Sequence, residues 1–102
     1  MTPTEIEKLL RREGMKPNWW SNGPRERYSA HSHDYHKVLY CAAGSITFVL
    51  LPSGERRELS AGGRLDLPAG QEHSAIVGAA GVTCAEGWRP ASSDQRSANR
   101  GQ

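Results

Sequence analysis

Residues 31–44 read HSHDYHKVLYCAAG and residues 62–73 read GGRLDLPAGQEH; together they hold all four histidines of the chain. Neutral imidazole is the commonest protein ligand of divalent transition metals. His31 and His33 are two residues apart, a spacing that places both side chains on the same face of a strand. His73 comes from a separate part of the chain. We therefore expect these three histidines to meet and to bind one metal ion.

Turn-forming residues recur at short intervals on both sides of these segments. They cluster at residues 22–24, 43–44, 52–54, 61–63, 69–70 and 78–81. Short runs of strand-forming residues lie between them, and two of these runs alternate in hydrophobicity, at Ile46, Phe48 and Leu50 and again at Leu65 and Leu67. This spacing is typical of an all-β sandwich or barrel.

The first histidine segment resembles the first sequence motif of the cupin superfamily. That motif is His-x-His, three or four residues, Glu, six residues and Gly. The chain matches it at His31, His33 and Gly44. It departs from the motif at Lys37, which stands in place of the Glu.

The second segment resembles the second cupin motif, which is Gly, five residues, Pro-x-Gly, two residues, His, three residues and Asn. The matching residues are Gly62, Pro68, Gly70 and His73. Here the departure is Val77, which stands in place of the Asn.

The resemblance covers about residues 17–88 and implies the fold of that superfamily, an antiparallel jelly-roll barrel. It also implies a divalent transition metal ion held by His31, His33 and His73. Imidazole ligands favour Fe, Mn, Ni, Zn or Cu over Ca or Mg, which prefer oxygen ligands. The expected fold class is therefore all-β, with a metal site inside the barrel.

The N-terminal segment predicts a short helix in front of the barrel. Thr2 and Glu5 have the spacing of a capping box, and Gly14 is placed to end the helix. Its apolar stripe, Ile6, Leu9 and Leu10, must dock on another surface, and a homodimer contact is one candidate. The predicted organisation is a helix over residues 1–14, a barrel over residues 15–90 and a polar tail over residues 91–102.

Size and charge limit the functional classes. At 102 residues the chain is one domain, and 13 basic against 11 acidic residues give no charge excess for nucleic acid or an anionic membrane. No apolar run approaches the roughly 20 residues of a membrane span, and the N-terminus has no signal-peptide pattern. Cys41 and Cys84 form no CxxC pair. We expect a soluble, cytoplasmic protein with reduced thiols, paired as a homodimer because a small barrel leaves sheet edges open.

Lys37 complicates the metal hypothesis. If residues 31–41 form one strand, the odd-numbered residues share the inward face, and Lys37 points toward the histidines. A protonated Lys has no lone pair for a metal. An ammonium group about 5 Å from a dication is repelled by roughly 6–7 kcal/mol at an effective dielectric constant of about 20. Four arrangements follow: Lys37 turns away through a bulge, is neutral, pairs with an anion bound to the metal, or stands in a site without metal.

The same strand pattern selects candidates for catalysis. Lys37 and Tyr35 share the inward face, and His36 is the third candidate. A regular strand points His36 outward, whereas a bulge would bring it in as a fourth ligand. Tyr28 either packs or hydrogen-bonds a substrate. The three tryptophans are expected as core or interface anchors: Trp19, Trp20 and Trp88.

Three functions fit these residues. The first is a metal-dependent enzyme, an oxygenase, isomerase or lyase, whose small anionic substrate is drawn to the metal and to Lys37. The second is a module that binds or senses a small anion without catalysis. The third is a protein whose site has decayed and which acts through its dimer surface. The fold by itself does not choose among them.

Overall fold

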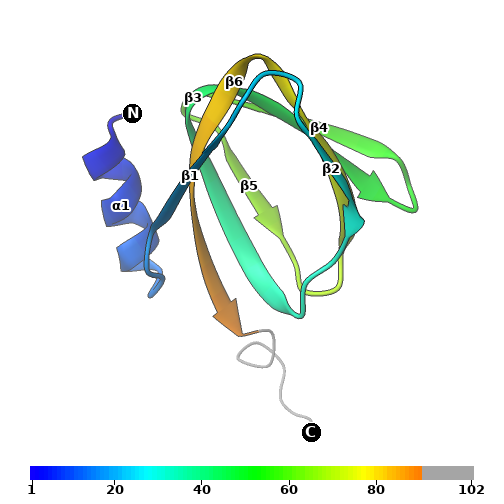
Figure 1. Ribbon diagram of the computed structural model, residues 1–102. Helices are drawn as coiled ribbons and strands as arrows, with labels where there is room; N and C mark the ends of the chain where they lie inside the picture. Colours follow the sequence, from blue (N-terminus) through cyan, green and yellow to red (C-terminus); the bar gives the residue numbers. More distant parts are fainter. Residues whose placement is uncertain (91–102) are drawn as a thin grey trace, which may run out of the picture.

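The computed structural model describes residues 1–90 of the 102-residue chain, so the predicted polar tail lies outside the described residues. One helix precedes six antiparallel strands in this part of the chain (Figure 1). In chain order the elements are α1 (Pro3–Arg12), β1 (Asn18–Asn22), β2 (Arg27–His31), β3 (Tyr35–Leu51), β4 (Glu55–Ser60), β5 (Arg64–Leu67) and β6 (Glu72–Pro90). The prediction of an all-β fold with one short N-terminal helix is confirmed. Within residues 1–90, no helix has the length and hydropathy that a membrane span requires.

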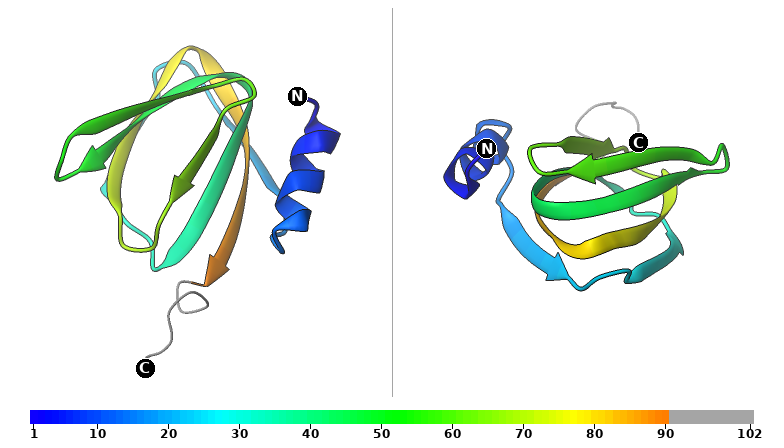
Figure 2. Two further views of the ribbon diagram at one scale, coloured as in Figure 1. Left: turned by 180° about the vertical axis from the view of Figure 1, so that it is seen from behind. Right: turned by 90° about the horizontal axis from the view of Figure 1, so that it is seen from above.

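The two long strands, β3 and β6, pair with each other and build both halves of the sheet. The first half of β3 lies between β5 and the second half of β6, which also pairs with β1. The second half of β3 lies between β4 and the first half of β6, which also pairs with β2. The two halves curl over each other into a barrel (Figure 2). This arrangement is the predicted jelly-roll architecture.

Both long strands bend at the same level, and glycines make the bends. Gly44 in β3 has a φ of 73° and Gly81 in β6 a φ of 80°, a left-handed conformation that L side chains rarely adopt. A Cβ atom on Gly44 would lie 1.9 Å from the carbonyl oxygen of Gly81. The backbones of the two bends therefore touch, and no side chain fits at Gly44. This contact is the physical reason for the glycine that ends the first motif.

Apolar side chains from both sheet halves fill the barrel. The buried cluster consists of Leu39, Cys41, Ile46, Phe48, Leu59, Leu65, Leu67, Ala75, Val77, Val82 and Cys84. Val77, which stands where the second motif has Asn, is one of these core residues. At that position the chain therefore has apolar packing where the motif has a polar group.

Helix α1 packs on the outside of the barrel. Its N-terminus has the predicted capping box: the Thr2 hydroxyl accepts a hydrogen bond from the Glu5 amide, and the Glu5 carboxylate accepts one from the Thr2 amide. Ile6 and Leu10 are fully buried in a cluster with residues of β3 and β6. Because the barrel of the same chain covers them, they are not available for the homodimer contact considered above.

Hydrogen bonds and ion pairs of Arg64 connect the end of the helix to the barrel. Arg64 of β5 donates hydrogen bonds to the carboxylates of Glu13 and Asp66 and to the hydroxyl of Tyr40, the last at 2.8 Å. Hydrogen bonding to this guanidinium lowers the pKa of both carboxyls below their ordinary values. Arg64 thus joins the C-terminal cap of α1 to the outer face of β3 and β5.

We predict that Arg64→Met lowers the melting temperature at pH 7 and that this difference from the wild type shrinks toward pH 3. The carboxyls of Glu13 and Asp66 have lowered folded-state pKa values, so their stabilisation is present above their ordinary pKa. It is lost as the pH falls through the lowered values. Thermal unfolding followed by circular dichroism measures this. Arg57→Met, which removes an exposed pair with Glu55, is the matched control and should have little effect. An equal loss at pH 7 and pH 3 would show that Arg64 acts through packing alone.

Candidate metal centre

Three histidines meet at one end of the barrel, where His31 is exposed, His33 is half-buried and His73 is buried. His31 is the last residue of β2, His33 lies in the connection to β3, and His73 is the second residue of β6. Their candidate ligand nitrogens all lie within 4.8 Å of one another. The ring centroids are 4.9 Å apart for His31 and His33, 4.4 Å for His31 and His73, and 5.5 Å for His33 and His73. The structure therefore brings together the three histidines that the sequence selected.

A β-bulge turns His31 toward the other two histidines. Tyr28 pairs with Ala75 and His31 pairs with His73, so residues 29–30 of β2 lie opposite the single residue Ser74. In a regular strand residues 28 and 31 would point to opposite faces, but both line the same pocket. The extra residue of the bulge restores the inward direction at His31. The expectation of one continuous strand over residues 31–41 is wrong, because β2 ends at His31 and β3 begins at Tyr35.

Hydrogen bonds at Nδ1 orient all three rings. Nδ1 of His31 lies 2.7 Å from the carbonyl oxygen of Ser29, and Nδ1 of His73 lies 2.9 Å from that of Gln71. A carbonyl only accepts, so Nδ1 carries the proton in both rings and Nε2 keeps a free lone pair. This is the tautomer that a metal ligand needs.

His33 shows the strongest sign of a missing partner. Its Nδ1 lies 3.2 Å from the hydroxyl of Tyr35, whose ring stacks on the imidazole at a centroid distance of 4.9 Å. Its Nε2 is buried and has no hydrogen-bond partner within residues 1–90. Burial lowers the pKa of His33 and of His73, and the charge of Lys37 adds to this effect. Neutral rings with a buried, unpaired nitrogen fit a divalent transition metal.

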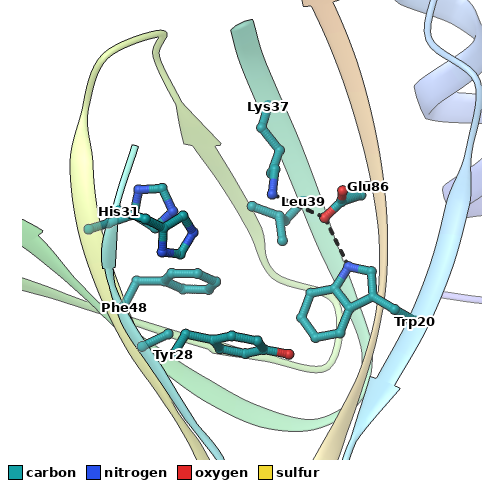
Figure 3. A pocket seen from close by; sticks show the side chains of 9 residues that line it. Trp20, Tyr28, His31, Lys37, Leu39, Phe48 and Glu86 are labelled. Atoms are coloured by element: carbon teal, nitrogen blue, oxygen red, sulfur yellow. Dashed lines mark hydrogen bonds and ion pairs between the residues drawn. The ribbon is translucent and has the colours of Figure 1, made fainter. Parts of the chain in front are cut away.

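A pocket of about 230 Å³ adjoins the histidines (Figure 3). Aromatic side chains form one side of it: Trp20, Tyr28 and Phe48. Polar groups form the rest, with His31 and His73 facing Lys37 and Glu86, and Leu39 and Ala75 complete the lining. Figure 3 shows the Lys37 side chain reaching into the pocket between His31 and Glu86. Lys37 thus points inward, as the parity of β3 predicts.

Lys37 is paired with a carboxylate that the sequence reasoning missed. Its Nζ lies 3.4 Å from Oε1 of Glu86, and each side chain is 13% exposed. Oε1 also accepts a hydrogen bond from the indole of Trp20 at 3.0 Å, and Oε2 accepts one from Trp88 at 2.8 Å. Glu86 is therefore a polar group of the site beyond the candidates selected from the sequence. The available signal was parity in β6, because Glu86 lies two residues after the buried Cys84 and shares its inward face.

The remaining candidates lie outside the histidine cluster or support it. His36 points away, with Nε2 at 3.3 Å from Asp66, so the alternative in which a bulge makes it a fourth ligand is not formed. Tyr35 lies between His33 and Trp88, and its ring is 5.4 Å from the indole. Of the three tryptophans expected as core or interface anchors, Trp20 packs against the core. The core alternative is wrong for Trp19 and Trp88, which are 37% and 49% exposed, and their interface role stays a prediction.

No family model matches the sequence, and no curated protein is significantly similar to it. Solved structures do match it. A cupin-2 domain protein from Shewanella frigidimarina has a TM-score of 0.62 and 17% identity, over 74% of this chain and 70% of that one. DMSP lyase DddQ from Ruegeria pomeroyi has a TM-score of 0.67 and 19% identity, over 82% of this chain and 41% of that one.

A third match is oxalate decarboxylase from Bacillus subtilis, whose Mn(II) centres have been characterised. It has a TM-score of 0.67 and 17% identity, over 76% of this chain and 22% of the larger protein. Identities at this level establish a shared fold. They confirm the resemblance of the two histidine segments at the level of architecture.

We predict that Lys37→Glu raises the affinity for Zn²⁺ about tenfold or more, because a ligating carboxylate replaces a repelling ammonium group. The same change should lower the stability of the metal-free protein, since two carboxylates then adjoin at residue 37 and Glu86. Calorimetric titration with Zn²⁺ and thermal unfolding measure the two effects. Lys37→Met separates them, because it removes the ammonium group without adding a ligand. Equal Zn²⁺ affinities in all three proteins would show that residue 37 does not act on the metal.

Proposed function

We propose that this small cupin-fold protein holds one divalent transition metal ion on His31, His33 and His73 and binds a small anion in the adjoining pocket. The observation that carries the proposal is the buried Nε2 of His33, which has no partner within residues 1–90. It belongs to a cluster of three histidines whose candidate ligand nitrogens all lie within 4.8 Å of one another. The three imidazoles suit Fe, Mn, Ni, Zn or Cu. A bound dication supplies positive charge and open coordination positions for an anionic oxygen.

The chain's own groups prepare the site before any metal arrives. Backbone carbonyls fix the rings of His31 and His73, and the Tyr35 hydroxyl fixes that of His33. Phe48 lies 6.1 Å from the ring of His73 and covers one side of the pocket. The histidine rings are therefore held in a fixed orientation, which lowers the cost of ordering them around an ion.

The charges in the pocket support an anionic ligand, because a bound metal ion gives the pocket its net positive charge. The charges of Lys37 and Glu86 cancel, so Lys37 does not give the metal-free pocket a net positive charge. With neutral histidines, a dication brings the pocket to a net charge of about +2, which one or two ligand anions would neutralise. Anion binding is thus expected to strengthen when metal is bound.

Catalysis is the second candidate, and it rests on the names of the structural matches, which include a lyase and a decarboxylase. Among the described residues that line the pocket, other than the histidines assigned to the metal, Lys37, Glu86 and Tyr28 carry groups able to exchange a proton with a bound molecule. Two indole hydrogen bonds and the ion pair with Lys37 occupy both carboxylate oxygens of Glu86, which favours a binding role over proton transfer. Binding without turnover therefore stands first, and an isomerase or lyase reaction second.

The homodimer and the cytoplasmic location stay predictions from the sequence. The sheet ends at β1 and β4, and β2 and β5 each pair with one neighbour, so unpaired strand edges remain among residues 1–90. We expect light scattering at micromolar concentration to give twice the 11.2 kDa mass of the chain. A particle of one chain mass would contradict the dimer.

We predict that His33→Ala and His73→Ala each abolish stoichiometric metal in the purified protein, whereas His36→Ala retains it. The fourth histidine is the matched control, because its ring faces Asp66 outside the pocket. Elemental analysis after loading with Zn²⁺ or Mn²⁺ measures the metal content, and circular dichroism checks the fold. Full metal content in both His33→Ala and His73→Ala would refute the ligand assignment.

A further inference from the structure

On the pocket wall that faces the histidines, the carboxylate of Glu86 accepts two hydrogen bonds of ordinary length, whereas the ammonium group of Lys37 has one longer contact. The two indole donors approach Glu86 at 3.0 and 2.8 Å, the ordinary range for a hydrogen bond. Lys37 lies 3.4 Å away, whereas charge-assisted N–H···O bonds usually measure about 2.7–2.9 Å. Trp20 and Trp88 therefore stabilise the Glu86 carboxylate without depending on Lys37. The described residues offer Lys37 no other hydrogen bond, so its N–H groups are free to meet a ligand.

The adjoining side of the pocket is aromatic. Trp20 and Tyr28 meet edge to face, with ring centroids 6.3 Å apart, and Phe48 lies beside the histidines (Figure 3). Aromatic walls bind planar groups well, through large contact area and stacking. The volume of about 230 Å³ is below the roughly 300–1,000 Å³ of pockets for drug-sized ligands. The fitting occupant is thus small and flat.

We propose that the ligand is a small planar carboxylate, an aromatic or unsaturated acid, whose carboxylate contacts Lys37 and whose flat body lies against Trp20, Tyr28 and Phe48. The proposal deepens the proposed function, since it concerns the same pocket. Among the described residues that line the pocket, Lys37 is the one cation, so a monoanionic group is matched better than a dianionic phosphate. Glu86 competes with the ligand for Lys37 and so tunes the affinity.

The test compares benzoate with its neutral analogue benzamide, by calorimetry on metal-free and Zn²⁺-loaded protein. Wild-type protein should bind benzoate more tightly than benzamide. Lys37→Met should weaken benzoate about tenfold or more, as expected for a lost charge-assisted hydrogen bond, and should change benzamide about twofold or less. Glu86→Gln should strengthen benzoate binding, because Lys37 then lacks its competing partner. Lys8→Met, on the exposed face of α1, is the matched control and should bind both probes as the wild type does.

The variants Lys37→Met and Glu86→Gln together distinguish ligand recognition from damage to the fold. If Lys37 and Glu86 only support the fold, both variants should bind benzoate and benzamide more weakly than the wild type does. That result would overturn the proposal. Benzoate binding no tighter than benzamide, or absent at millimolar concentration in both forms, would overturn it too. Lys37→Gln replaces Lys37→Met should the latter not fold. If the wild-type protein does not bind Zn²⁺ but still prefers benzoate over benzamide through Lys37, only the metal site is refuted. If it binds Zn²⁺ but shows no such preference, only the ligand class is refuted.

Discussion

The pairing of β3 with β6 is the interaction on which the rest of the structure depends. These two strands run antiparallel through both sheet halves, and they bend together where the backbones of Gly44 and Gly81 touch. One end of this ladder sets His73 opposite Leu50, and the other sets Glu86 opposite Leu39. The same pair of strands thus supplies a histidine to one wall of the pocket and the carboxylate to the other. β2 then adds His31 at the edge of β6, and the connection from β2 to β3 adds His33.

The parts that could be predicted from the sequence are those encoded by residue type and spacing. Turn residues and alternation predicted the strands, and the capping box predicted the helix start. The paired motifs selected three histidines that do meet. The bulge at residues 29–30 could not be read in this way, because Ser and Ala carry no signal for an extra residue. His31 reached the predicted place through a local geometry that the prediction did not contain.

Glu86 shows a different limit. A Glu in a strand near the end of the barrel reads as a solvent-facing residue, because isolated carboxylates are costly to bury. The buried carboxylate is stabilised because Lys37 and the indoles of Trp20 and Trp88 all contact it. Such a set of partners is a property of the folded barrel. The chain lacks the carboxylate of the first motif at Lys37, yet it places another on the neighbouring strand and so keeps a negative group in the pocket.

The bulge in β2 also bears on how such a site survives a change in strand length during evolution. Because strand side chains alternate, removing one of residues 29–30 would give a regular strand with His31 two positions after Tyr28, on the same inward face. The core cluster draws none of its residues from β2 beyond the partly buried Tyr28. A deletion of one codon at this point would thus keep the candidate ligand opposite His73 and leave the barrel packing intact. Strands of two lengths, one with the bulge and one without it, can on this basis present the same histidine to the site.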